Sequence, residues 1–344
     1  MKKFKALVTA EIIAPQLEEA LSDKVEFCYA GYYLDHNVLP HEELLEKVRD
    51  IDILICEYDT ISADVFDAAN NLKIIICCRG GVKTVVDIEK AMQNRVIVCH
   101  NQGRNAEALT DLVIGYIIDL TRNITKTNQL IHSRVITADA SSKPKEYKDT
   151  VWGLDNNSPF IRYRGRSINQ MTLGLVGFGN TGRSLARKAN ALGMKILAYD
   201  PYTEFKDKPD YVKSVHFEEL LACSDIISLH CILSSQTRNM FSAKEFEQMK
   251  TGSYFINTSR GELVIEEDLI ASLKSGKLAG AALDVTIKEP IASDSPLLDA
   301  PNLLITPHIA GSAEHVQIRG TEMVLESLSD WINGEKPRNS IVYK

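Results

Sequence analysis

Residues Met171 to Asp200 read MTLGLVGFGNTGRSLARKANALGMKILAYD, and the pattern of apolar residues changes twice along them. Leu173–Val176 is a short apolar run of strand length, and the spacing of apolar residues from Asn180 to Leu192 is helical. Lys195–Tyr199 then has the length and composition of a second strand. This order predicts a strand–helix–strand unit, in which the glycine-rich segment GFGNTG (177–182) joins the first strand to the helix.

The spacing of these glycines is typical of a dinucleotide-binding turn. Gly177 permits a tight turn, Gly179 lets backbone N–H groups approach a pyrophosphate, and Gly182 lets helix and strand pack closely. The pyrophosphate would bind at the helix N-terminus, where free N–H groups favour an anion. Asp200 ends the second strand, where its carboxylate can bind a ribose 2′-hydroxyl and repel a 2′-phosphate, which favours NAD over NADP. The alternative is a glycine-rich turn in an α/β domain without a ligand, and the strand, the helix and the terminal Asp in register weigh against it.

The composition is that of a soluble globular protein with room for two domains. The chain has 344 residues, 44% of them hydrophobic and 25% charged. Its net charge of −7 argues against nucleic acid as a partner, because phosphate binding needs a basic surface. The apolar runs are too short for a signal peptide or a membrane span. Seven cysteines without CxxC spacing predict reduced thiols, a cytoplasmic location and no metal site.

The N-terminal part alternates between strand and helix patterns, which predicts a parallel sheet covered by helices. Strands are expected near 5–10, 25–30, 51–57, 72–78 and 96–100, and helices near 11–23, 40–49, 63–69 and 87–94. The loop Arg79-Gly80-Gly81-Val82-Lys83-Thr84 follows the fourth strand. Ligands bind at the carboxyl ends of strands in such sheets, so this loop is either an anion-binding loop or a solvated turn.

A single helix of about 40 Å is expected from Ala106 to about Ser133, as the crossover into a second domain. Residues 137–165 are polar and irregular, with Trp152 as an anchor, and predict a functional loop or an interface arm. Further strands are expected near 226–231, 253–257, 280–284 and 303–306. The segment after Gly311 is helical and can return to the first domain. The predicted domains are therefore 1–105 with 312–344, and 106–311.

Three charged residues follow the last expected strands of the second domain. Arg260 lies in NTSRGELVIEEDL, Glu289 in TIKEP and His308 in TPHIAG. Together with GFGNTG, LHCILSSQT and GAALDV, these motifs resemble the D-isomer-specific 2-hydroxyacid dehydrogenase family, and CRGGV and GRNAEALTD resemble its phosphoglycerate dehydrogenase-like branch. The similarity covers nearly the whole chain. Two positions depart from the family pattern, Ile232 in place of a proline and Thr181 in the glycine turn.

The resemblance implies two doubly wound α/β domains, a flavodoxin-like substrate domain and a Rossmann NAD-binding domain, with a cleft between them. It also implies a homodimer that interconverts a 2-keto acid and a D-2-hydroxy acid by hydride transfer. Arg260 would bind the substrate carboxylate, because a guanidinium is a rigid fork of donors. His308 would be the acid–base group and Glu289 its partner.

Further residues receive roles from the same resemblance. Cofactor contacts are expected at Gly177, Gly179, Asn180, Thr181, Gly182, Asp200, His230, Thr258 and Asp284, and substrate contacts at Arg79, Gly80, Gly81 and Val82. His230 is either an NAD contact or a packed histidine, and a strand-end Asp such as Asp284 also serves as a helix cap. Arg79 and Lys83 indicate a polar or extended acid as substrate. Two alternatives stay open, a formate dehydrogenase, against which Glu289 speaks, and an NAD(H)-sensing binding protein.

Overall fold

The computed structural model describes residues 3–137, 158–205 and 208–342. Its internal contacts divide the chain into two compact units, Met1–Asn105 with Ser312–Lys344, and Ala106–Gly311. Each unit is an α/β domain built on its own sheet. The chain thus leaves the first unit at Asn105 and comes back to it after the second unit is complete.

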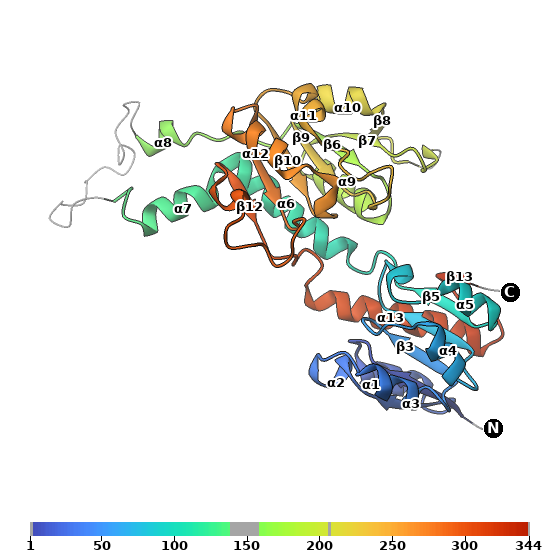
Figure 1. The fold of residues 1–344 in the computed structure, drawn as a ribbon. Helices are drawn as coiled ribbons and strands as arrows, with labels where there is room; N and C mark the ends of the chain where they lie inside the picture. Colours follow the sequence, from blue (N-terminus) through green and yellow to red (C-terminus); the bar gives the residue numbers. More distant parts are fainter. Residues whose placement is uncertain (1–2, 138–157, 206–207, 343–344) are drawn as a thin grey trace. The chain divides into compact units, whose positions relative to one another are not determined.

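The sheet of the first unit has the strand order β13-β5-β4-β3-β1-β2, and its strands β13, β5 and β3 are labelled in Figure 1. Its strands are β1 (Phe4–Val8), β2 (Val25–Tyr29), β3 (Ile53–Cys56), β4 (Ile74–Cys77), β5 (Ile97–His100) and β13 (Ser340–Val342). Strands β1 to β5 pair in parallel, as the alternating pattern predicts. Strand β13 pairs antiparallel with β5. Its few residues carry no recognisable strand pattern, and the sequence did not predict it.

Helices cover both faces of this sheet, because its central strands are apolar on both sides. The helices are α1 (Ala14–Leu21), α2 (Tyr32–Asp35), α3 (His41–Lys47), α4 (Ala63–Ala68), α5 (Ile88–Gln93) and α13 (Glu314–Ile332), with a 3₁₀ turn η1 (Val82–Thr84). Ile53 and Ile55 of β3 pack in the cluster that contains α1 and α13, whereas Leu54 packs in the cluster that contains α3 and α4. Val324 of α13 lies fully buried in that first cluster.

The second unit has a seven-stranded sheet in the order β12-β11-β10-β9-β6-β7-β8. Its strands are β6 (Thr172–Val176), β7 (Lys195–Tyr199), β8 (Val212–Ser214), β9 (Ile226–Leu229), β10 (Ser253–Asn257), β11 (Leu278–Leu283) and β12 (Leu303–Ile305). All neighbours pair in parallel. The order reverses between β6 and β9, which is the switch point of a doubly wound nucleotide-binding sheet. The predicted fold class is therefore confirmed for both units.

The helices of the second unit are α6 (Ala106–Arg122), α7 (Ile124–His132), α8 (Pro159–Arg162), α9 (Asn180–Ala191), α10 (Phe217–Cys223), α11 (Ala243–Gln248) and α12 (Glu266–Lys274), with 3₁₀ turns η4 (Gly261–Leu263) and η5 (Pro296–Asp299). Helices α6 and α9 pack on one face of the sheet and α10, α11 and α12 on the other, whereas α7 and α8 extend away from it (Figure 1). In the part of the chain that the structure describes, no helix combines the length and apolar character needed to cross a membrane. Four of the cysteines, Cys56, Cys77, Cys78 and Cys99, are free and buried.

The prediction of one helix from 106 to about 133 is wrong. Asn123 has a left-handed backbone (φ 56°) and separates α6 from α7. Asparagine adopts this conformation more readily than most residues, and Asp119 accepts a hydrogen bond of 2.8 Å from the backbone N–H of Thr125 across the break. Most of the predicted arm 137–165, including Trp152, lies outside the described residues.

Candidate active site

The glycine turn lies between β6 and α9, where the sequence predicts it. Gly177 has φ 100°, which an L side chain rarely adopts. A Cβ atom on Gly182 would lie 2.4 Å from the carbonyl oxygen of Gly177, so only glycine lets α9 start this close to the strand. A Cβ atom on Gly179 would meet no atom within 4 Å, which leaves the backbone there open to a ligand. These features fit a pyrophosphate at the start of α9.

Asp200 connects this turn to the end of β7. Its Oδ2 accepts a 2.8 Å hydrogen bond from the N–H of Phe178, and its Oδ1 accepts one of 2.9 Å from the N–H of Tyr202. A carboxylate has about four lone-pair positions, so both oxygens can accept further bonds. Asp200 can therefore order the turn and receive ribose hydroxyls at the same time.

Two polar atoms without a partner lie at the carboxyl ends of the next strands. His230 follows β9 beside the turn, since a Cβ atom on Gly177 would lie 2.6 Å from its carbonyl carbon. Its Nε2 is 2.9 Å from Ser228 Oγ, and burial lowers the pKa of His230 to about 3. Among the described residues, His230 Nδ1 and Thr258 Oγ1 are buried and have no hydrogen-bond partner. Unsatisfied buried groups at the nucleotide-binding edge fit a bound dinucleotide.

Asp284 is buried directly after β11 and holds the loop that carries His308. Its Oδ1 accepts hydrogen bonds from Thr306 Oγ1 (2.5 Å) and the N–H of Ile309 (2.9 Å), and its Oδ2 accepts one from the N–H of Ala310 (2.8 Å). The hydroxyl of Tyr116, on α6, hydrogen-bonds Thr306 Oγ1. The sequence analysis missed Tyr116 and Thr306. The one sequence signal that could have identified Thr306 as a site residue is its position in the motif TPHIAG. Nothing in the local sequence indicates that Tyr116 belongs to the site.

His308 and Glu289 form a hydrogen-bonded pair. His308 Nδ1 lies 2.7 Å from Glu289 Oε2, and the side chains are 49% and 38% exposed. The other Glu289 oxygen, Oε1, accepts a 3.1 Å bond from the N–H of Thr286. His308 has φ 56°, and its N–H donates to the carbonyl oxygen of Asp284 at 2.8 Å. A non-glycine residue in this conformation needs surrounding structure to hold it, and such residues cluster at functional sites.

Arg260 follows β10, at the same edge of the sheet. Its side chain is exposed and donates to the carbonyl oxygen of Ser259 at 2.6 Å, while Asn257 Nδ2 donates to the carbonyl oxygen of Arg260 at 2.8 Å. A Cβ atom on Gly261 would lie 2.2 Å from the carbonyl carbon of Thr286, so the Arg260 turn packs on the loop that leads to Glu289. In the part of the chain that the structure describes, no carboxylate lies within ion-pair distance of Arg260.

The loop Arg79–Val82 belongs to the first unit and follows β4. Gly80 and Gly81 are exposed, and the Arg79 guanidinium lies 5.0 Å from the ring centroid of Tyr58. The side chain of Val82 is buried in the core with α3 and α4, so it is not available to a ligand.

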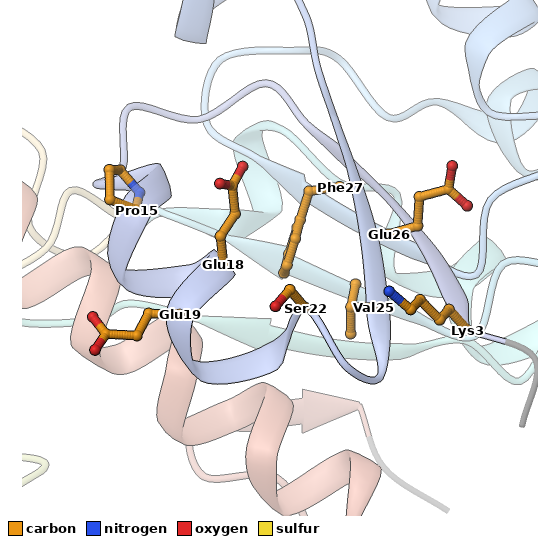
Figure 2. A pocket seen from close by; sticks show the side chains of 8 residues that line it. All are labelled: Lys3, Pro15, Glu18, Glu19, Ser22, Val25, Glu26 and Phe27. Carbon is orange, nitrogen blue, oxygen red and sulfur yellow. The ribbon is translucent and has the colours of Figure 1, made fainter.

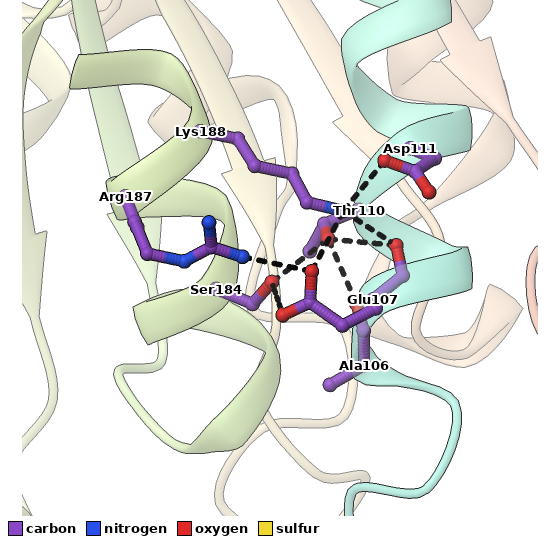
Figure 3. Close-up of polar contacts among 7 residues, drawn as sticks. All are labelled: Ala106, Glu107, Thr110, Asp111, Ser184, Arg187 and Lys188. Atoms are coloured by element: carbon purple, nitrogen blue, oxygen red, sulfur yellow. Dashed lines mark hydrogen bonds and ion pairs between the residues drawn. The ribbon is translucent and has the colours of Figure 1, made fainter. Parts of the chain in front are cut away.

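A polar cluster joins α6 to α9, the helix that begins at the glycine turn (Figure 3). Glu107 accepts hydrogen bonds from Ser184 (2.7 Å) and Arg187 (2.8 Å) and pairs with Lys188 at 3.1 Å. Lys188 also pairs with Asp111 at 2.6 Å. Partial burial acts to raise the pKa of Glu107, but these donors outweigh it and lower that pKa to about 2. The cluster fixes the helix whose N-terminus faces the turn.

A hollow of about 740 Å³ lies elsewhere, on the first unit between α1 and β2 (Figure 2). Its lining residues are Lys3, Pro15, Glu18, Glu19, Ser22, Val25, Glu26 and Phe27. Three carboxylates against one lysine make it unfit for an anionic substrate, and none of the predicted site residues lines it.

Comparison with known proteins agrees with this geometry. Residues 114–310 match the family model described as D-isomer specific 2-hydroxyacid dehydrogenase, NAD binding domain. A glyoxylate reductase of Thermococcus litoralis is 35% identical over 98% of this chain and 97% of its own length. A hydroxypyruvate reductase of Thermotoga maritima is 33% identical over 83% of this chain and 87% of its own. The solved structure of a glyoxylate reductase from Paecilomyes thermophila is 25% identical, with a TM-score of 0.76 over 99% of both chains.

The family model covers more than half of the chain, and the Thermococcus litoralis relative covers nearly all of it. The nucleotide-binding geometry of the second unit is what an NAD-dependent enzyme requires. The chain therefore belongs to the family of D-isomer specific 2-hydroxyacid dehydrogenases and is an NAD-dependent oxidoreductase that acts on CH–OH groups.

Proposed function

We propose that this protein reduces a 2-keto acid to the D-2-hydroxy acid with NADH, and that Arg260, His308 and Glu289 carry the reaction. When bound, the nicotinamide supplies the hydride in reduction and accepts it in oxidation. The observation that carries the proposal is the 2.7 Å contact between His308 Nδ1 and Glu289 Oε2, at the sheet edge that also presents Arg260. The names of the relatives make glyoxylate and hydroxypyruvate the first substrates to try.

His308 gives a proton to the carbonyl oxygen in reduction and takes it back in oxidation. Its Nδ1 is engaged by Glu289, which leaves Nε2 as the nitrogen that exchanges the proton with the substrate. The Glu289 carboxylate stabilises the imidazolium and fixes the ring. The left-handed backbone of His308, and the hydrogen bonds that its loop donates to Asp284, hold this pair in place before the substrate arrives.

Arg260 binds the substrate carboxylate and orients the keto group. A guanidinium matches a carboxylate through two parallel hydrogen bonds. Among the described residues, Arg260 has a hydrogen-bond acceptor at Nη1 alone, the carbonyl oxygen of Ser259, so its other donors are available to a substrate. Asp200, His230, Thr258 and the glycine turn bind NAD.

The test follows NADH oxidation with glyoxylate, hydroxypyruvate, pyruvate, branched and sugar-derived 2-keto acids. We expect turnover with at least one of them, and a loss of kcat of about a hundredfold or more in His308→Gln. Arg260→Ala should mainly raise the KM for the keto acid. His315→Gln, which changes an exposed histidine, is the matched control and should retain activity. NADH binding without turnover on any of these acids would contradict the proposal and favour an NAD(H)-sensing role.

We further propose that the chain forms a homodimer through its second unit. Helix α7 has no buried residue, and Ile124 and Ile131 are each 52% exposed. Phe160 on α8 is 69% exposed, and both helices extend away from the sheet (Figure 1). A short helix with no buried residue gains little stability on its own. Ile124 and Ile131 lie seven residues apart and so share one face of α7, and an exposed apolar face marks an interaction surface. A second copy of the chain would cover them.

A further inference from the structure

A line of hydrogen bonds inside the second unit connects helix α6 to the loop that carries His308. The Tyr116 hydroxyl hydrogen-bonds Thr306 Oγ1, and Thr306 Oγ1 donates to Asp284 Oδ1 at 2.5 Å. The ring of Tyr116 is packed in the core with Ala282 of β11, and the residue is only 5% exposed. Tyr116 therefore reaches from the buried face of α6 to the edge of the sheet at which Asp284 lies.

The direction of these bonds follows from the number of protons on each group. A threonine hydroxyl has one proton. Asp284 accepts hydrogen bonds on both carboxylate oxygens, also from the N–H groups of Ile309 and Ala310, so Thr306 gives its proton to Asp284. The bond between Tyr116 and Thr306 must then use the proton of Tyr116. Burial raises the pKa of Tyr116 to about 12, and the nearby Asp284 carboxylate contributes, so this proton is present at physiological pH.

Asp284 holds the His308 loop at two places. Its carboxylate accepts the N–H groups of Ile309 (2.9 Å) and Ala310 (2.8 Å), and its carbonyl oxygen accepts the N–H of His308 at 2.8 Å. The residue is 1% exposed, and a buried charge is stable only where donors satisfy its oxygens. Rotation of the Asp284 side chain would break these bonds, and the bond from Thr306 opposes that rotation. The orientation of Asp284 thus fixes where the backbone of His308 lies.

We propose that Tyr116 is a positioning residue for the acid–base step. Its hydroxyl, acting through Thr306 and Asp284, holds the His308 loop in the orientation that proton transfer requires. The proposal rests on the function proposed above, in which His308 exchanges a proton with the keto acid. A small displacement of an acid–base group lowers the rate of proton transfer far more than it lowers binding. Loss of the Tyr116 hydroxyl should therefore lower kcat and leave the KM for the keto acid and the affinity for NADH nearly unchanged.

The first experiment removes this hydroxyl and keeps the buried ring, in Tyr116→Phe. We expect kcat, for the keto acid that the wild type reduces fastest, to fall roughly twofold to tenfold, as for the loss of one neutral hydrogen bond. Tyr254→Phe is the matched control, because Tyr254 lies in the same core, is 7% exposed, and has no hydrogen-bond partner for its hydroxyl among the described residues. A wild-type kcat in Tyr116→Phe, or an equal fall in Tyr254→Phe, would refute the proposal.

Further variants separate positioning from general damage. Thr306→Val breaks both bonds and should lower kcat roughly tenfold to a hundredfold, because one of them ends on a charged group. Thr306→Ser keeps a hydroxyl and should recover most of this loss. In the Thr306→Val background, Tyr116→Phe should have no further effect, since the connection is already broken. In the His308→Gln background it should not change the residual turnover, whereas a merely structural role of Tyr116 would lower that turnover too.

A second readout does not depend on turnover. In protein labelled with ¹⁵N on histidine, the Nδ1–H signal of His308 reports its hydrogen bond to Glu289, and His308→Gln identifies that signal. We expect Tyr116→Phe to shift or broaden it and Tyr254→Phe to leave it in place. An unchanged His308 signal in Tyr116→Phe would refute the proposal. If the wild-type protein reduces no keto acid, the function proposed above fails, and the histidine signal still decides whether Tyr116 positions His308.

Discussion

At the scale of single residues, the contact between Glu289 and His308 makes a sharp prediction. Replacing Glu289 by Gln keeps a hydrogen-bond acceptor but removes the charge that stabilises the imidazolium. We expect kcat for keto-acid reduction to fall roughly tenfold to a hundredfold, because the lost free energy is that of a hydrogen bond to a charged group. The affinity for NADH should change little. Steady-state kinetics and a fluorescence titration with NADH measure the two quantities. Glu247→Gln, at an exposed position of the same unit, is the control. An equal fall in the control would count against the assignment.

The residues that we propose for the chemistry can be predicted from short motifs, but the residues that hold them in place cannot. Arg260, Glu289 and His308 each lie in a short motif after a strand, and the structure places them at one edge of one sheet. The support of His308 runs from Tyr116 through Thr306 to Asp284. That connection joins positions 190 residues apart. A hydrogen bond between such distant positions leaves no periodic or local trace in a single sequence.

At the scale of elements, the glycine turn predicts two different effects of adding one methyl group. Gly182→Ala would place a Cβ atom 2.4 Å from the Gly177 carbonyl oxygen and should displace α9, lowering both the melting temperature and NADH affinity. Gly179→Ala meets no protein atom within 4 Å, so the fold should be retained. Its methyl group instead occupies space open to the pyrophosphate, and NADH should bind roughly tenfold more weakly. Thermal unfolding and NADH titration test both variants. Unchanged NADH affinity in Gly179→Ala would argue against the predicted binding mode.

The cluster between α6 and α9 predicts a pH dependence of stability. The pKa of Glu107 is lowered from 4.5 to about 2 in the folded protein. A carboxyl group with a depressed pKa stabilises the fold above its unfolded value, and that contribution is lost as the pH falls from about 4.5 towards 2. Because the side chain is half exposed, the effect is modest.

Urea unfolding at pH 7 and at successively lower pH tests this expectation. Glu107→Gln should be less stable than the wild type at pH 7, and the difference should shrink as the pH falls below 4.5. Glu247→Gln again serves as the control, with no such pH dependence expected. A difference between Glu107→Gln and the wild type that stays constant over this range would exclude the carboxylate as its cause.

The types of the elements were predictable where the apolar pattern is regular. The prediction failed where the backbone conformation of a single residue ends a helix. The strand expected at 195–199 is β7, and the strand expected at 253–257 is β10. The helix expected from 106 to 133 is interrupted at Asn123, which has a left-handed backbone. The helical spacing of apolar residues continues past this residue, so the sequence pattern does not reveal the break. Strands β8 (VKS) and β13 (SIV) have three residues each and no apolar run, whereas the equally short β12 (LLI) is apolar throughout and was predicted.

At the scale of the whole molecule, the exposed side chains of α7 predict how the chain assembles. Ile131→Glu places a charge on the surface that a second copy is expected to cover, so it should weaken the dimer and lower the sedimentation coefficient at micromolar concentration. Ile318→Glu changes an isoleucine of similar exposure (43%) on α13 of the first unit and is the control. If the wild-type chain sediments as a monomer, the proposed dimer is wrong.

The return of the chain to its first unit has a consequence for synthesis on the ribosome. Helix α13 supplies Val324 and Leu328 to the core that covers Ile53, Ile55 and Ile74. Translation delivers these two residues only after the whole of 106–311 has emerged. The second unit has all its strands in one continuous segment and can fold as soon as it is released. The nascent protein therefore acquires its nucleotide-binding half first, while the N-terminal half waits with an uncovered apolar face, a natural target for chaperones.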